Sequence, residues 1–130
     1  MIHLLQQVCS GGGKLRRVRT LPLSPDSPLA CALELQFDSG VLSILAVEED
    51  DTVALSQSEL DGSLGVHTNP IWSRCIDKPL QWAWLMTNQQ GYTDGVRLEF
   101  NDLESPEPVV VDLVVAASSI NIYLAQAIEP

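Results

Sequence analysis

The sequence predicts a mainly β fold: a single antiparallel sheet, curled or barrel-like, of six to eight strands with one or two short helices. An α+β fold is the alternative. Apolar residues alternate with polar ones over several short segments, which is the period of a half-buried strand. Stretches rich in Gly, Asn, Asp, Ser and Pro separate these segments, as hairpin turns do. Parallel strands need a crossover of about a dozen residues or more, and only residues 56–79 are long enough for one.

At 130 residues, the chain is expected to form one domain, residues 1–130, that buries a core without disulfides or metal. The three cysteines have no Cys-x-x-Cys spacing, which favours free thiols in a reducing cytoplasm. No stretch approaches the ~18 consecutive apolar residues of a membrane span. The basic residues follow the short apolar start instead of preceding it, so no signal peptide is predicted. We therefore expect a cytoplasmic protein.

The N-terminal part of the chain is expected to hold one short apolar segment and one cationic strand. Residues 2–9 fit either a first strand or a helical turn, and residues 10–13 form a break. Residues 14–21 combine apolar residues with four cations, which favours an exposed or edge strand. The three prolines of residues 22–28 predict an irregular loop.

Residues 29–47 predict a β-hairpin. Asp38-Ser39-Gly40 supplies the turn, with glycine where a positive φ is needed, and residues 41–47 form the return strand. Residues 52–55 predict a further short strand. The apolar positions of the first strand recur every second residue: Leu29, Cys31, Leu33, Leu35 and Phe37.

After a polar loop, residues 70–76 predict a short helix. Asn69 or Thr68 is suited to the N-cap and Pro70 to the first helical position, and the helix ends before Pro79. The side chains expected to face the core are those of Ile71, Trp72 and Cys75.

Residues 80–88 are predicted to form a strand. On a helix, Trp82 and Trp84 would point about 200° apart, whereas on a strand they share a face with Leu80 and Met86. Alternation and aromatic content favour the strand, with both tryptophans in the core. The alternative is that their face is open, which would make it a large apolar patch that needs a partner. Residues 88–95 form a turn, after which apolar residues alternate with polar ones in a strand from 96 to 100.

The C-terminal third predicts two more strands. Residues 101–108, rich in acids and proline, are expected to form a turn. Residues 109–117 are the most apolar run, interrupted by Asp112, and predict a central strand covered on both faces. Residues 120–124 alternate in the last strand.

The formal net charge of −10 is distributed unevenly. Residues 1–20 carry four cations and no acid, whereas residues 21–130 carry three cations and all 17 acids. This excess argues against binding to nucleic acid, which requires a basic surface, and against docking on an anionic membrane. It favours a basic partner.

No set of residues predicts a catalytic, metal or cofactor site, so the sequence favours a non-enzymatic protein. A pair of His67 and Cys75 is conceivable, but Cys75 falls on the expected buried face of its helix. The four consecutive acids at 48–51 lack the alternating geometry of a divalent-cation loop. The Ser-Gly-Gly-Gly-Lys run at 10–14 does not match a phosphate-binding loop.

The turn after the tryptophan strand is the predicted interaction surface. Amides and aromatic residues gather there, and such side chains anchor protein interfaces. Under the structural alternative, Asn88 and Asp94 cap their own turn and Tyr92 covers the edge of the core. The predicted surface consists of Asn88, Gln89, Gln90, Tyr92, Asp94 and Arg97.

The run from Trp82 to Phe100 resembles a family of small bacterial proteins of unknown function, as do the hairpin at 35–40 and the acids at 49–51. The resemblance covers the chain from about residue 29 onward and implies no activity. Compact acidic bacterial proteins include immunity or antitoxin-like partners, an analogy at the level of fold.

Three functions are open to such a protein. The first is a cytoplasmic protein-interaction module, one form of which is an immunity or inhibitor-like protein with a basic partner. The second is a small-ligand-binding fold or weak enzyme, with a pocket between the sheet and the 70–76 helix and His67 at its mouth. The third is a self-associating structural homodimer.

Overall fold

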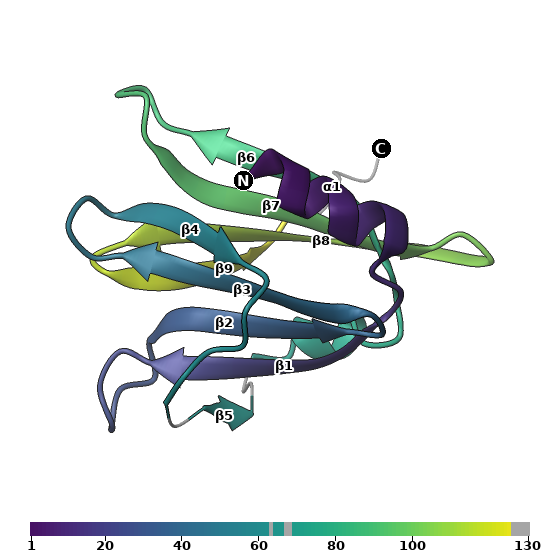
Figure 1. Cartoon of the computed structure of the whole chain (residues 1–130), viewed down its shortest axis with the longest axis horizontal. Coiled ribbons are helices and arrows are strands. Elements are labelled where there is room, and N and C mark those ends of the chain that lie inside the picture. Colours follow the sequence, from purple (N-terminus) through teal and green to yellow (C-terminus); the bar gives the residue numbers. More distant parts are fainter. Residues whose placement is uncertain (63, 67–68, 126–130) are drawn as a thin grey trace.

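The computed structural model describes residues 1–62, 64–66 and 69–125, in which one α-helix precedes nine strands (Figure 1). Eight of these strands have five residues or more, and β5 has two. A 3₁₀ turn lies between β5 and β6. The bounds are α1 Ile2–Gly11, β1 Leu15–Pro22, β2 Ala30–Phe37, β3 Gly40–Val47, β4 Thr52–Ser56, β5 Gly65–Val66, η1 Trp72–Arg74, β6 Leu80–Thr87, β7 Thr93–Asp102, β8 Ser105–Ala116 and β9 Ser119–Leu124.

The strands form one antiparallel sheet in the order β4-β3-β2-β9-β8-β7-β6, with β1 paired to β2 and β5 paired to β1. In the described residues β2 and β9 pair only at Ala30 and Ile120. The sheet therefore has two layers, β1–β5 and β6–β9, and it curls so that β4 contacts β7 and β8 across the core. The predicted fold class, mainly β with a curled antiparallel sheet, is confirmed.

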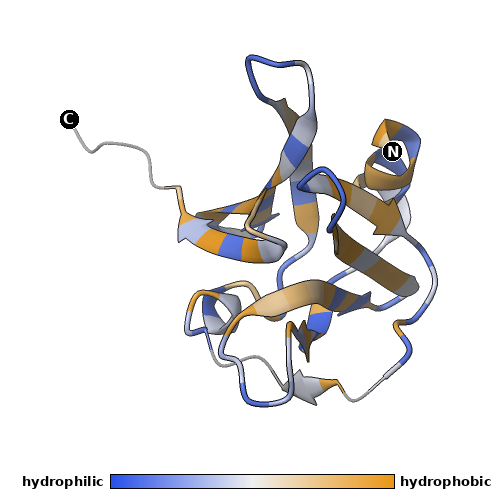
Figure 2. Ribbon diagram, turned by 90° about the vertical axis from the view of Figure 1, so that its left-hand side faces the viewer, coloured by the Kyte–Doolittle hydropathy of each residue, from blue (hydrophilic) through white to orange (hydrophobic). Residues whose placement is uncertain are grey.

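Aromatic rings join the two layers. Phe37 of β2 and Phe100 of β7 stack with their centroids 6.5 Å apart. Trp72 meets Phe100 edge-on at 6.3 Å, and both of these side chains are completely buried. Burying one such ring contributes about 1.5–3 kcal/mol to folding. Hydrophobic and hydrophilic bands alternate along the strands in Figure 2, as expected for a sheet with one buried face.

Of the two alternatives for residues 2–9, the structure has the helix. Leu4, Leu5, Val8 and Cys9 form a stripe at helical spacing that packs on the core, and α1 lies against β6 (Figure 1). The helix ends where the backbone N–H of Gly12 donates to the carbonyl of Val8 at 2.9 Å. No helix in the described part of the chain is long and apolar enough to span a membrane.

Of the two alternatives for the cationic strand, exposed or edge, β1 fits the edge position but is only partly exposed. Arg16 and Arg17 are exposed, but Leu15 and Val18 are completely buried. β1 pairs along β2, and Arg19 and Thr20 also pair with β5. The strand therefore turns its cations outward and its apolar residues to the core, as any half-buried strand does.

The hairpin predicted at 29–47 is confirmed, with β2 beginning one residue later at Ala30. The positive φ predicted for Gly40 is wrong, because the turn is made by Asp38 and Ser39 and Gly40 is the first residue of β3. The predicted strand at 52–55 is also present, as β4. The predicted 70–76 helix is a single 3₁₀ turn, where the side-chain oxygen of Asn69 accepts from the backbone N–H of Ile71 at 3.0 Å. Trp72 and Cys75 are buried, as predicted.

The strand predicted at 80–88 is present as β6, but the predicted burial of Trp82 and Trp84 is wrong. These side chains are 57% and 45% exposed. The pairing of β6 with β7 has an irregularity between Leu80 and Trp82. Leu80 is buried, yet beyond the irregularity the core-facing residues are Ala83 and Leu85. A slip of one residue exchanges the two faces of a strand, so the alternation of Leu80, Trp82 and Trp84 does not report a common face.

The prediction for residues 101–108 is also corrected. β7 continues to Asp102, the turn is confined to Leu103 and Glu104, and β8 begins at Ser105. β8 is not covered on both faces: Val109, Val111, Leu113 and Val115 are buried, whereas the alternate residues between them are partly exposed. The outer face of this layer is therefore open.

Candidate functional site

The outer face of β6–β9 presents two rows of cross-strand neighbours. In the first, Trp84 of β6 pairs with Arg97 of β7, which pairs with Asp112 of β8, which pairs with Tyr123 of β9. In the second, Trp82 pairs with Glu99, which pairs with Val110. Directly paired residues project on the same side of a sheet, with Cβ atoms about 4.5–5.5 Å apart. We call this surface the aromatic face: Trp82, Trp84, Arg97, Glu99, Val110, Asp112 and Tyr123.

Large rings are exposed on this face. Tyr123 is 55% exposed, comparable to the two tryptophans. Three half-exposed rings of this size leave about 350 Å² of ring surface in contact with water, estimated from the ~250 Å² of a large aromatic side chain. The rings lie at the ends of the rows, and the charged Arg97 and Asp112 separate Tyr123 from the tryptophans, so the surface mixes aromatic and charged groups, as the anchor residues of protein interfaces do.

The centre of the aromatic face is a preformed ion pair. The Nε of Arg97 donates to Oδ1 of Asp112 at 2.7 Å, and Nη2 donates to Oδ2 at 2.8 Å. This two-point geometry is specific to guanidinium and carboxylate. The hydrogen bond to Asp112 raises the pKa of Arg97. The Asp112 side chain is 14% exposed, so the carboxylate that holds the Arg97 guanidinium is itself largely enclosed by the sheet.

Glu99 differs from its neighbours on the aromatic face. Its side chain is half-buried between the paired residues Trp82 and Val110. Among the described residues, its carboxylate has no hydrogen bond and no ion pair. Arg97 lies two residues away on the same strand but is bound to Asp112. A negative charge without a counter-ion therefore lies beside an exposed indole.

The predicted turn surface divides into two parts. The side-chain oxygen of Asn88 accepts from the backbone N–H groups of Gln90 and Tyr92 at 2.9 and 3.2 Å, and its amide donates to Asp94 at 3.4 Å. Asn88 and Asp94 thus hold their own turn, as the structural alternative expected. Gln89, Gln90 and Tyr92 are exposed where the β6–β7 hairpin projects from the sheet (Figure 1). Arg97 belongs to the aromatic face.

Sequence reasoning missed the aromatic partners of Arg97. Asp112 interrupts the apolar run of β8, and an isolated acid in such a run signals an outward-facing position opposite a cation. Ala83 and Leu85 offered a second apolar face for β6. Together these signals could have placed Trp82 and Trp84 outside.

A first cleft, of about 500 Å³, lies where the second hypothesis placed its pocket, between the sheet and the 69–72 turn. Thr20, Leu29, Trp72, Ile120 and Ile122 line it. None of its described lining residues is titratable, and His67, predicted at its mouth, lies outside the described residues. The indole Nε1 of Trp72 is buried without a hydrogen-bond partner, and because it is sealed from solvent it does not present a donor to the cleft.

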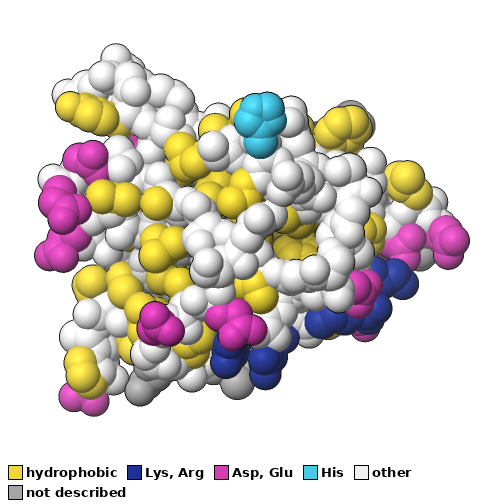
Figure 3. Space-filling view, in the orientation of Figure 1, with side chains coloured by type: hydrophobic (Ala, Val, Ile, Leu, Met, Phe, Trp, Pro, Cys, Tyr) yellow, Lys and Arg dark blue, Asp and Glu magenta, His cyan; other side chains and the backbone are white. Residues whose placement is uncertain are grey.

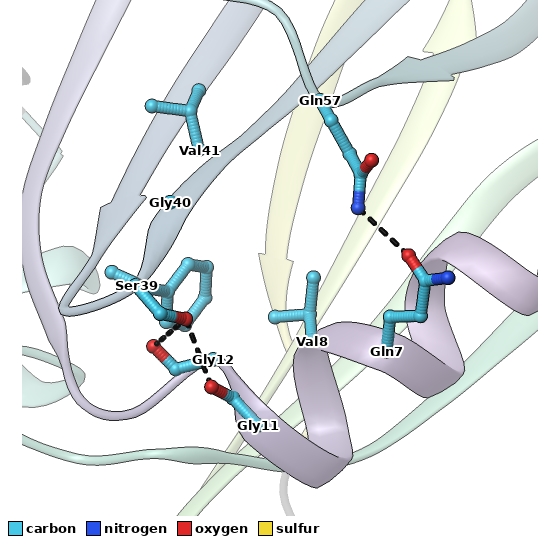
Figure 4. Close-up of a pocket in the computed structure, with 9 residues that line it drawn as sticks. Gln7, Val8, Gly11, Gly12, Ser39, Gly40, Val41 and Gln57 are labelled. Atoms are coloured by element: carbon cyan, nitrogen blue, oxygen red, sulfur yellow. Dashed lines mark hydrogen bonds between the residues drawn. The ribbon is translucent and has the colours of Figure 1, made fainter.

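A second cleft, of about 350 Å³, separates the end of α1 from the β2–β3 turn (Figure 4). The Nε2 of Gln57 donates to Oε1 of Gln7 at 2.9 Å across it. The hydroxyl of Ser39 donates to the carbonyl of Gly11 at 2.8 Å. Val8 and Val41 line the space between these bonds. These amide and hydroxyl groups are occupied with each other and supply no acid, base or nucleophile.

The most buried charge is structural. Glu34 has no exposed surface, because the loop after β4 crosses above it. Its carboxylate accepts from Nε of Arg19 at 2.8 Å, from Nε2 of Gln36 at 2.8 Å and from the backbone N–H of Leu60 at 2.9 Å. Burial raises the pKa of Glu34, but these hydrogen bonds outweigh burial and leave the pKa lowered.

The residues considered for nucleophilic or metal chemistry have other roles. Burial raises the pKa of the Cys75 thiol to about 12, so the thiol is protonated. In the acidic turn, Asp50 accepts from the hydroxyl of Thr52 at 2.6 Å and Asp51 accepts from the backbone N–H of Ser118 at 2.9 Å. No group of three or more His, Cys, Asp or Glu side chains in the described residues is arranged to hold a metal ion.

Comparison with known proteins identifies a family but no activity. No curated protein and no solved structure matches the chain. A family model described as a family of unknown function (DUF6334) matches residues 1–129. The match covers nearly the entire sequence, including the tryptophan strand and both hairpins. The chain therefore belongs to this family of unknown function.

Proposed function

We propose that the protein is a non-enzymatic, cytoplasmic interaction module that binds another protein through the aromatic face. The observation that carries the proposal is the exposure of Trp82, Trp84 and Tyr123 on one open face of the sheet. Tryptophan, tyrosine and arginine are the residues that dominate binding energy at protein interfaces. The aromatic face combines all three around a preformed ion pair.

Charge supports a basic partner over a second copy of the chain. The protein carries a net charge of −10, so two copies repel each other. Figure 3 shows acids at the end where the β3–β4 turn lies, and cations along the lower edge and toward the opposite end, where further acids lie beside them. Acids also follow the aromatic face toward the β7–β8 turn, where Glu104 and Glu107 are exposed. An immunity or inhibitor-like protein against a basic target is one form of this function.

The proposal is tested by affinity capture with a matched set of variants. The wild type, Trp82→Ser/Trp84→Ser and Leu23→Ser are immobilised at equal density and exposed to lysate of the source cell. Leu23 is an exposed apolar residue on the other layer and serves as the control. A partner retained by the wild type and Leu23→Ser, and lost from the double variant, supports the proposal. Equal recovery on all three overturns it.

Three further measurements complete this test. Thermal unfolding must show that the double variant is folded, since its side chains are on the surface. Tyr92→Ala and Asp94→Ala determine whether the projecting turn adds to the contact. Sedimentation velocity at micromolar concentration distinguishes the homodimer: a wild-type dimer that becomes a monomer in Trp82→Ser/Trp84→Ser would assign the aromatic face to self-association instead.

The cleft beside Trp72 favours small-ligand binding as a second candidate. Its volume of about 500 Å³ lies in the range of ligand pockets, about 300–1,000 Å³. Blocking it with Ile122→Trp should abolish any ligand-induced rise in melting temperature found by screening metabolites. Such a rise that survives the substitution would exclude this cleft.

A further inference from the structure

We infer that the aromatic face recognises a cationic side chain of its partner, an arginine in preference to a lysine, between the indole of Trp82 and the carboxylate of Glu99. The inference rests on the proposed function and names the chemistry of the partner.

Glu99 has no ion-pair partner among the described residues. A half-buried carboxylate is less well hydrated than a free one, and such a group gains from a counter-ion. Its cross-strand neighbours, Trp82 and Val110, are both apolar and cannot supply one. Among the described residues none neutralises Glu99, so the missing cation can come from another molecule.

The guanidinium of Arg97 is already bound to Asp112. Arg97 is the one cation that the register places on the aromatic face, and it could have paired with Glu99 on its own strand. Both its Nε and its Nη2 instead donate to Asp112. Because Asp112 holds the guanidinium on the β8 side, Arg97 does not neutralise Glu99, and the neighbour of Glu99 on β6 is the exposed Trp82.

The cross-strand neighbour of Glu99 on β6 is the exposed ring of Trp82. Trp82 is the more exposed tryptophan, and tryptophan offers the best cation–π surface among the aromatic residues. A carboxylate next to an exposed indole attracts a cation in two ways, by charge and by the ring quadrupole. Guanidinium can stack on the ring while donating two hydrogen bonds to the carboxylate, which an ammonium group cannot do.

Nearby charge favours the same occupant. Asp102, Glu104 and Glu107 lie at the β7–β8 end of the layer. Lys78, the cation that contacts this end, donates its Nζ to the carbonyl of Glu107 at 2.6 Å. The local field is therefore negative and attracts a basic segment while it repels an acidic one.

The test uses peptides of defined charge as probes. Fluorescein-labelled hexa-arginine, hexa-lysine and hexa-glutamate peptides are titrated with the full chain, and binding is followed by anisotropy. We expect binding in the order hexa-arginine, then hexa-lysine, with none for hexa-glutamate. Glu99→Gln removes the charge while keeping the shape, and should weaken hexa-arginine binding about fivefold, the value of one favourable ion pair at a partly exposed site.

Matched variants separate a site from net charge. Glu107→Gln removes the same charge from the exposed surface and should change the affinity less than about twofold. Trp82→Phe and Trp82→Leu should weaken hexa-arginine binding in that order, because the ring quadrupole is reduced and then lost. Equal effects of Glu99→Gln and Glu107→Gln, or no binding of hexa-arginine at all, would overturn the inference.

The two proposals fail differently. If the lysate partner is lost from Trp82→Ser/Trp84→Ser but kept by Glu99→Gln, the interaction face stands and cation recognition falls. If hexa-arginine binding requires Trp82 and Glu99 while capture is indifferent to both tryptophans, cation recognition stands and the proposed protein partner falls.

Discussion

Replacing the buried carboxylate of Glu34 with the isosteric amide, Glu34→Gln, should destabilise the protein by about 3 kcal/mol at neutral pH. In the wild type, one carboxylate oxygen accepts from Arg19 and Gln36 and the other accepts from the backbone N–H of Leu60. The amide keeps one acceptor and turns an NH₂ group toward the N–H of Leu60. That leaves a buried amide without an acceptor, which costs about 1–3 kcal/mol.

Two further effects on the bonds to Arg19 and Gln36 contribute to the expected loss of about 3 kcal/mol. The bonds from Arg19 and Gln36 change from charge-assisted to neutral acceptors, a loss of about 1 kcal/mol or more. Arg19 is 27% exposed and regains some hydration, which reduces that loss. A change of about 3 kcal/mol is a large part of the 5–15 kcal/mol that stabilises a typical domain.

The assay is urea unfolding followed by circular dichroism, at pH 7 and at pH 3, with Glu107→Gln, at an exposed residue, as the surface control. Because hydrogen bonding lowers the pKa of Glu34 in the folded state, its contribution is complete above the unfolded pKa of about 4.3. The contribution is lost as pH falls below that value and through the folded pKa. The stability gap between wild type and Glu34→Gln should therefore narrow at pH 3. A gap below 1 kcal/mol at pH 7, or an equal gap at both pH values, would refute the reasoning.

Three other substitutions or treatments test separate features. Gly13→Ala should destabilise the protein by about 2 kcal/mol in thermal unfolding, because Gly13 has φ +78° and a Cβ there would lie 2.6 Å from Asp38. Gly11→Ala, where a Cβ meets open space, is the control. Equal losses of stability in the two variants would contradict the role of the Gly13 backbone. Asp112→Asn should lower the free energy of unfolding by about 1 kcal/mol, and by less in 1 M salt, since the Arg97 side chain is 44% exposed and the ion pair is screened. A loss of stability that does not depend on salt would indicate an effect on packing instead. Burial raises the pKa of Cys75 to about 12, so this thiol should resist Ellman's reagent at pH 8 until guanidinium unfolds the chain, and modification of native Cys75 at the rate of free cysteine would contradict its burial.

The alternation of apolar and polar residues, together with turn-forming residues, predicted the individual strands and turns of the fold. The hairpin of β2 and β3 is signalled by alternating apolar residues and a short polar turn, and it is present, although Gly40 does not adopt the positive φ predicted for it. The fold class followed from the same signals, together with the shortness of most connections. These features depend on residues close in sequence, where propensity and period act directly.

The composition of the candidate site depends on register, which the alternation of β6 alone does not reveal. The irregularity beside Trp82 reverses the faces of β6, and only the isolated Asp112 and the second apolar face of Ala83 and Leu85 indicate that the tryptophans lie outside. The covering of Glu34 likewise depends on a loop from a distant part of the chain. The turn residues were identified by composition, but the aromatic face required the alignment of four strands.

In the part of the chain that the structure describes, β2 and β9 share a single backbone pair, which has a consequence for cooperativity. Each layer is held internally by ladders of hydrogen bonds. Between the layers, the described residues add a backbone bridge of Lys14 to Pro79, just before β6, and the aromatic side chains of Phe37, Phe100 and Trp72 pack across the core. Unfolding of the whole molecule as one unit therefore depends on aromatic contact across the core. Where that contact is weakened, the two layers become separate units of hydrogen exchange, each protected to a different degree.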